Sequence, residues 1–155
     1  MKTIILVVVL VLVSSKVSAF EDTSKLIATF IEMRNNELIL EGTRPRVFLN
    51  RSCRLIATLD REGKISVALF TKGVGKESIA EFQQKDNLHK YELPVVDTKL
   101  DNILIVRVNY SDTASGLRGD RILKIERQKK SLFKVTIDHK NSAGLSSVIE
   151  CVIKH

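Results

Sequence analysis

The sequence predicts an all-β fold: a single antiparallel barrel or sandwich of about eight strands, with meander topology, closed by one disulfide. Three observations support this prediction. Apolar residues mostly alternate with polar ones, and turn-forming residues separate the alternating runs. The only two cysteines, Cys53 and Cys151, lie in the first well-defined run and in the last. The alternative is an α+β domain in which an N-terminal helix packs on the sheet.

The chain begins with a segment that is typical of a cleavable secretory signal. Lys2 gives a basic start, residues 4–13 form an unbroken apolar run, and small residues precede Ala19. The run is about half the ~20 residues that a membrane-spanning helix needs. We therefore expect cleavage after Ala19, a single β domain over 20–155, and a secreted or periplasmic protein that does not span a membrane.

The next segment, residues 22–40, fits two structures. Residues 27–33 alternate, and Asn35-Asn36 can turn the chain into the apolar run 38–40, so we expect a hairpin. The same residues also carry a helical stripe, which Asp22, Thr23 or Ser24 would cap. The stripe consists of Leu26, Ile27, Phe30 and Ile31.

Residues 53–70 give the clearest hairpin in the chain. Residues 53–59 and 65–69 alternate, and the sequence Asp60-Arg61-Glu62-Gly63 between them supplies turn residues, with glycine where a positive φ is needed. Residues 71–87 are less strand-like. There, residues 78–85 suggest a short helix with Ile79 and Phe82 facing inward. Pro94 places a sheet edge or a break within residues 91–96.

The C-terminal third predicts four more elements. Residues 100–110 are rich in branched side chains and suggest a central strand, followed by a polar loop over 111–120. Residues 121–127 and 132–139 form a hairpin, and 147–153 form the last strand. Cys151 shares a face with Ile149 and Ile153, as Cys53 does with Leu55 and Leu59. Both sulfurs then point into one core, which predicts a disulfide and an oxidising compartment.

The positive charge of the chain is concentrated in one segment. The formal net charge is +7, and residues 121–140 hold seven basic side chains against Glu126 and Asp138. Such a surface suits acidic partners, such as an acidic protein face or lipid headgroups. The alternative is a hairpin whose charge only maintains solubility and protects it from edge pairing. The candidate anionic-partner surface consists of Lys124, Arg127, Lys129, Lys130 and Lys134.

The sequence contains no pattern that predicts catalysis, a cofactor or a metal. The three histidines are far apart in the sequence, and no nucleophile elbow or phosphate-binding loop occurs. The absence of tryptophan argues against a stacking surface for nucleic acid. We therefore expect a non-enzymatic binding domain that holds a small apolar ligand or an anionic surface. The interior pocket would be lined by Leu55, Leu59, Val67, Phe133 and Val135.

Two other functions fit the same composition. An inhibitor of a secreted enzyme would present a rigid loop, either 111–120 or 71–77. A small hydrolase would need polar residues that converge in a cleft. Lipocalin-like barrels resemble this chain in secretion, size, meander and early-to-late disulfide, but their Gly-x-Trp signature is absent because the chain has no tryptophan.

Two short motifs have named chemistry. Arg118-Gly119-Asp120 resembles an integrin-recognition tripeptide, and we expect it in the loop that precedes the strand starting near Arg121. Asn50 and Asn109 fit the acceptor pattern for N-glycosylation.

Overall fold

The computed structural model describes residues 23–45, 51–72, 77–83 and 87–154. The predicted signal segment 1–19 and the candidate acceptor Asn50 lie outside these ranges. Residues 23–30 are helical. The other elements are ten strands where about eight were expected: β1 (Glu37–Thr43), β2 (Ser52–Leu59), β3 (Ile65–Lys72), β4 (Glu77–Glu81), β5 (His89–Tyr91), β6 (Val95–Lys99), β7 (Ile103–Asp112), β8 (Arg118–Lys129), β9 (Leu132–Asn141) and β10 (Ser146–Lys154).

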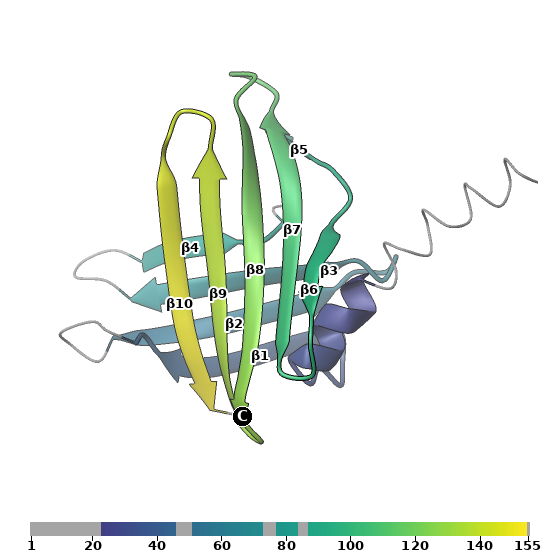
Figure 1. The fold of residues 1–155 in the computed structure, drawn as a ribbon, viewed down its shortest axis with the longest axis vertical. Coiled ribbons are helices and arrows are strands. Elements are labelled where there is room, and N and C mark those ends of the chain that lie inside the picture. Colours follow the sequence, from purple (N-terminus) through teal and green to yellow (C-terminus); the bar gives the residue numbers. More distant parts are fainter. Residues whose placement is uncertain (1–22, 46–50, 73–76, 84–86, 155) are drawn as a thin grey trace, which may run out of the picture.

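All ten strands belong to one antiparallel sheet, which confirms the predicted fold class. The strand order is β4-β3-β2-β1-β10-β9-β8-β7-β5, and β6 also pairs with β7. The sheet therefore consists of two meanders, β1–β4 and β7–β10, joined where β10 pairs with β1. Figure 1 shows the meanders as two layers whose strands run across one another. The sheet is not closed, because its path ends at β4 and at β5.

The predicted disulfide is present at the corner where the layers meet. Cys53 on β2 and Cys151 on β10 are bonded, and both are buried. Gly42 on β1 lies beside them, and a Cβ there would be 2.4 Å from the Val152 carbonyl oxygen and 2.9 Å from the Cys151 sulfur. Only glycine lets β1 approach β10 this closely. The bond indicates an oxidising, extracytoplasmic environment.

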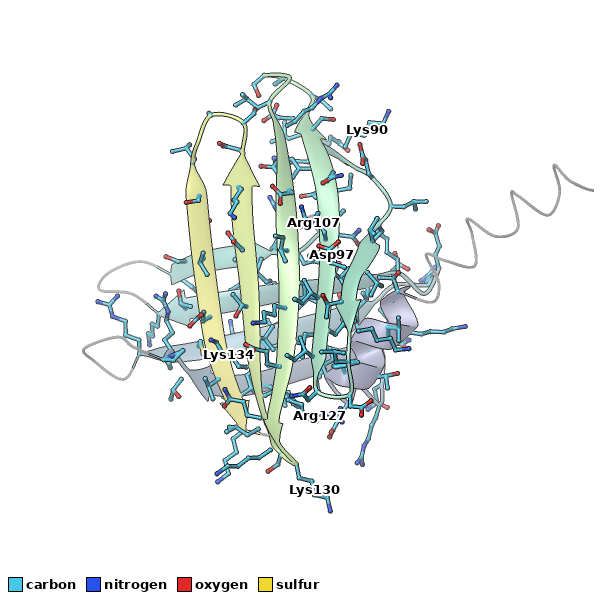
Figure 2. All side chains as sticks on the ribbon, viewed as in Figure 1. Lys90, Asp97, Arg107, Arg127, Lys130 and Lys134 are labelled. Atoms are coloured by element: carbon cyan, nitrogen blue, oxygen red, sulfur yellow. A yellow bond between two sulfur atoms is a disulfide. The ribbon has the colours of Figure 1, made fainter. Side chains whose placement is uncertain are left out.

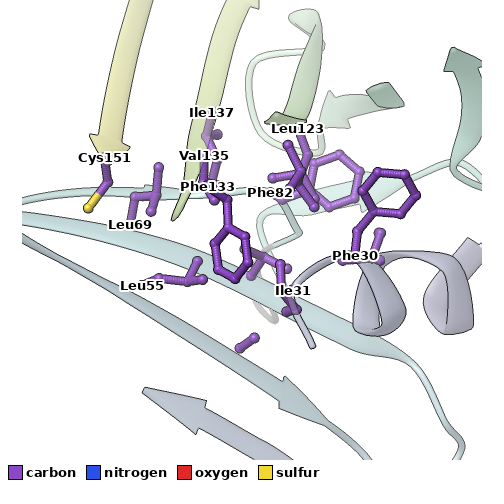
Figure 3. Close-up of a cluster of buried hydrophobic side chains, with 14 of the residues drawn as sticks. Phe30, Ile31, Leu55, Leu69, Phe82, Leu123, Phe133, Val135, Ile137 and Cys151 are labelled. Carbon is purple, nitrogen blue, oxygen red and sulfur yellow. The ribbon is translucent and has the colours of Figure 1, made fainter. Parts of the chain in front are cut away.

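The space between the layers holds an apolar core. The alternating residues of β2, β3, β7, β8, β9 and β10 face it, as their burial patterns show. Figure 3 shows part of this core, with Phe133 next to Ile31 and Phe30 next to Phe82. The residues expected to line an interior pocket belong to this packed core: Leu55, Val67, Phe133 and Val135 are at most 1% exposed, and Leu59 packs against them.

The N-terminal hairpin prediction is wrong over residues 23–30, which form one short helix packed on the all-β sheet. Within the helical stripe, Ile27, Phe30 and Ile31 are buried and Leu26 is partly buried. The helix is tied to both layers. The Ser24 hydroxyl accepts a hydrogen bond from the Ile65 amide of β3 (3.2 Å), and Arg127 of β8 donates to the Phe30 carbonyl (3.4 Å). The residues that make these contacts are far apart in the sequence, so the local pattern of apolar residues cannot predict them.

The helix predicted over residues 78–85 is also wrong for residues 78–83, and residues 84–85 lie outside the described ranges. Residues 77–81 form β4, an edge strand that pairs with β3 from Glu77↔Lys72 to Glu81↔Ala68. The spacing of Ile79 and Phe82 resembled a helical face, but Phe82 is buried and Ile79 is 53% exposed. Pairing with β3 therefore overrides the weak local preference.

The remaining elements agree with the sequence. The hairpin of residues 53–70 is β2–β3, and its turn is held by the Asp60 carboxylate, which accepts from the Glu62 and Lys64 amides (2.9 Å each). Residues 92–94 separate β5 from β6, as Pro94 predicted. β7 has neighbours on both sides. β8 begins three residues before and ends two residues after the predicted strand, β9 ends two residues later, and β10 is longer by one residue at each end.

Candidate functional site

One end of the second layer carries polar side chains on its inner face. On β7, β8 and β9 the inward-facing positions change from aliphatic residues to Tyr110, Arg121 and His139. These strands are neighbours, and Arg121 is paired directly with His139. The three side chains lie at the end of the strands opposite to Arg127 and the helix. We call them, with Tyr91 of β5, the polar end of the interior.

A glycine lets Tyr110 reach across β8. Tyr110 is paired with Gly119, which is paired on its other side with Asn141 of β9. A Cβ at Gly119 would lie 2.5 Å from the Tyr110 hydroxyl oxygen and 2.5 Å from the Lys140 carbonyl oxygen. With no side chain in the way, the Tyr110 hydroxyl makes a hydrogen bond with His139 Nε2. Gly119 thus allows a side-chain hydrogen bond between Tyr110 of β7 and His139 of β9, across β8.

Arg121 is the most unusual residue of this cluster. It is only 7% exposed, and its guanidinium lies over the rings of Tyr91 (5.6 Å) and Tyr110 (5.3 Å). Nη1 donates a hydrogen bond of 2.6 Å to the Glu81 carbonyl of β4, while Nε is buried and has no hydrogen-bond partner in the part of the chain that the structure describes. Among the described residues, no carboxylate forms an ion pair with it.

The burial of this cluster changes its acid–base properties. Burial lowers the pKa of His139 below its usual value, and the charge of Arg121 lowers it further. Burial raises the pKa of the Tyr110 phenol, against the opposing effect of Arg121. Both groups are therefore uncharged at neutral pH, and Arg121 supplies the positive charge.

A pocket of about 210 Å³ opens beside the cluster, where β4 lies against β9. It combines the Arg121 and His139 side chains with aliphatic surface and with the edge of β4. The Phe82 amide donates a hydrogen bond to the Val67 carbonyl of β3. Because the direction of the backbone hydrogen bonds alternates along an antiparallel strand, the N–H and C=O groups of Ile79 and Glu81 point away from β3. The pocket is lined by Ile79, Ala80, Glu81, Arg121, Ile137, His139 and Ser147.

Carboxylates lie among the residues of the predicted anionic-partner surface. Lys124 contacts Glu126 (3.0 Å), and Lys134 contacts both Glu126 (3.9 Å) and Glu150 (3.2 Å). Lys129 and Lys130 are exposed at the tip of the β8–β9 hairpin, where Figure 2 shows Lys130.

Arg127, the fifth of these residues, serves the helix. Its guanidinium pairs with Glu32 (3.6 Å) and lies over the Phe30 ring (5.8 Å). Figure 2 shows Arg127 near the hairpin tip, beside the helix.

The Arg118-Gly119-Asp120 motif lies in a strand and not in the expected loop. Arg118 begins β8, and all three residues pair with β7, from Ser111↔Arg118 to Asn109↔Asp120. The loop is shorter than predicted, because β7 ends at Asp112. The motif lines an open groove of about 690 Å³ together with Asn109, the second glycosylation candidate. Asn109 is exposed, and its amide donates to Glu92 (3.1 Å).

Comparison of the chain with protein-family models, with curated proteins and with solved structures found no match. Within the described ranges, no helix is long and apolar enough to cross a membrane. The same part of the chain contains no group of three or more His, Cys, Asp or Glu side chains that could hold a metal ion.

From the sequence alone, Arg121 is one of the seven basic residues of segment 121–140 and is not distinguished as a binding residue. One signal could have distinguished it, because Arg121 falls in phase with the apolar residues Leu123 and Ile125 of the same strand. An arginine at an inward-facing position is a candidate for a specific role.

Proposed function

We propose that this protein is a secreted or periplasmic, non-enzymatic binding domain that takes up a small anionic ligand in the pocket beside Arg121. The observation that carries the proposal is an arginine that is 7% exposed, lines a pocket and has no carboxylate partner among the described residues. A buried charge without a counterion costs several kcal/mol, which cation–π contacts offset only in part. An anion that enters the pocket would supply the missing partner.

From the sequence we expected a binding domain for a small apolar ligand or an anionic surface, and a small anionic ligand is a more specific partner. The residues expected to line an interior pocket are packed against one another, whereas the Arg121 pocket is open and has mixed polarity. The basic hairpin supports an anionic partner less well, because carboxylates lie among its lysines. A ligand that combines a negative group with a small apolar body fits the residues that line the pocket.

Thermal unfolding of the folded protein with benzoate, phenyl phosphate or phenyl sulfate tests this function. A ligand at a hundredfold excess over its Kd stabilises the folded state by about 2.7 kcal/mol. We expect at least one of these anions to raise the melting temperature of the wild type, and Arg121→Gln to abolish the effect. Arg118→Gln is the matched control, because Arg118 is an exposed arginine of the same strand. Equal stabilisation of the Arg121→Gln variant would contradict the proposal.

An enzyme inhibitor is the second candidate, and one observation favours it. The β7–β8 turn is rigidly held: Asp112 accepts from the amides of Ala114 (2.8 Å) and Ser115 (2.9 Å), which lower its pKa. Thr113 also donates its amide to the Leu88 carbonyl (2.8 Å). Inhibition of a secreted hydrolase that is lost when residues 113–117 are replaced by a glycine-serine linker would support this function.

A further inference from the structure

We infer that the ligand of the Arg121 pocket is a small organic monocarboxylate, held by the side-on edge of the guanidinium. This inference rests on the proposed function and specifies the ligand class. It depends on three features of the site: the orientation of Arg121, the charge of the groups around it, and the space beside it.

The guanidinium presents one free edge. Nη1 is engaged by the Glu81 carbonyl, and the Tyr91 and Tyr110 rings restrict the plane of the group. Nε, which forms the side-on edge together with Nη2, is buried and has no hydrogen-bond partner among the described residues. Two parallel N–H groups in a plane match the two oxygens of a carboxylate, and this fork is the geometry in which arginine binds carboxylates most specifically.

The electrostatics of the site favour a single negative charge. Tyr110 and His139 are neutral at physiological pH, since the pKa of the phenol is raised and that of the imidazole is lowered. The carboxylates of Asp120 and Asp138 already act on His139. Asp120 and Asp138 are paired with Arg107 (3.9 Å) and Lys140 (3.7 Å), so they leave the positive charge of Arg121 to the ligand. A monoanion balances this charge, whereas a dianion such as a phosphate monoester exceeds it.

The space beside Arg121 limits the size of the acid. The pocket volume of about 210 Å³ is below the roughly 300–1,000 Å³ of typical small-molecule pockets. Ala80 and Ile137 supply aliphatic surface for the body of the ligand, and the Ser147 hydroxyl and the β4 backbone supply polar contacts. This room suits a short-chain or single-ring acid and does not enclose a long acyl chain.

Isothermal titration of the wild type with benzoate, benzamide and phenyl phosphate tests the inference. Benzamide has nearly the same shape as benzoate without the charge, so it should bind about 10- to 100-fold more weakly. Phenyl phosphate should also bind more weakly than benzoate. The comparison uses the unaltered chain and does not depend on whether a variant folds.

Two variants complete the test. Arg121→Lys retains the charge but lacks the planar edge, so its affinity for benzoate should fall at least about tenfold. Arg118→Lys should bind as the wild type does.

The outcomes separate the two proposals. Tighter binding of phenyl phosphate than of benzoate, or unchanged affinity of Arg121→Lys for benzoate, would overturn the carboxylate inference and leave the proposed function standing. If none of benzoate, phenyl phosphate and phenyl sulfate binds the wild type, the proposed function itself is overturned.

Discussion

Reduction of the Cys53–Cys151 disulfide should remove a large part of the stability of this protein. The bonded residues are 98 positions apart, so the bond closes a loop that includes nearly all described strands. In the chain-entropy treatment, a loop of this length restricts the denatured state by about 4.7 kcal/mol at 25 °C. Total stabilities of domains are about 5–15 kcal/mol, so the reduced protein should be marginal.

Urea unfolding with and without a reductant, followed by far-ultraviolet circular dichroism, measures this effect. We expect reduction to lower the free energy of unfolding by about 3–5 kcal/mol. A Cys53→Ala, Cys151→Ala double variant is the control, because its unfolding should not respond to the reductant. A loss smaller than about 1 kcal/mol on reduction would refute the reasoning, since a loop of this length cannot restrict the denatured state so little.

Three further predictions concern the polar end and the helix. Gly119→Ala should destabilise the protein by about 1–3 kcal/mol, because the added methyl group displaces Tyr110. The NMR signals of the His139 ring should then show that its hydrogen bond with Tyr110 is lost, and unchanged signals would contradict this prediction. Arg127→Gln should loosen the helix over residues 23–30, so the amides of the helix should exchange faster with solvent, while the protein still binds benzoate. Amide exchange at the wild-type rate would show that Arg127 does not hold the helix. The pKa of His139 is lower in the folded state than in the unfolded chain, so the unfolded state takes up the proton first as the pH falls below about 6.5. Stability should therefore fall with pH from about 6.5 downward, and less steeply in His139→Asn than in the wild type; equal slopes in urea titrations would be inconsistent with a neutral, buried imidazole.

Much of the fold can be predicted from local patterns. Asp60 and Gly63 mark the β2–β3 turn, and the two cysteines fall in phase with apolar residues on their strands, so the hairpin and the disulfide follow from the sequence. The helix over residues 23–30 does not. Its residues satisfy both periods, and the contacts that decide between them, such as Arg127 with Phe30, link positions 97 residues apart.

The candidate site was harder to predict than the fold. It depends on strand register: Tyr110 meets His139 only because Gly119 lies between them and is paired with both strands. An alternating pattern fixes which face a side chain occupies, but not which side chains of neighbouring strands lie opposite one another. Arg121 looked like one charge among seven because its burial is a tertiary property.

The NMR signal of the Arg121 Nε–H group during titration of the wild-type protein with benzoate tests the central claim most directly. This group is buried and has no hydrogen-bond partner among the described residues, so a bound carboxylate should give it a strong hydrogen bond. We predict a saturable downfield shift of the Arg121 signal, with smaller changes at His139 and Ser147. If the NMR signal of Arg121 does not shift during the titration while the signals of Lys129 and Lys130 at the hairpin tip do, the account is contradicted.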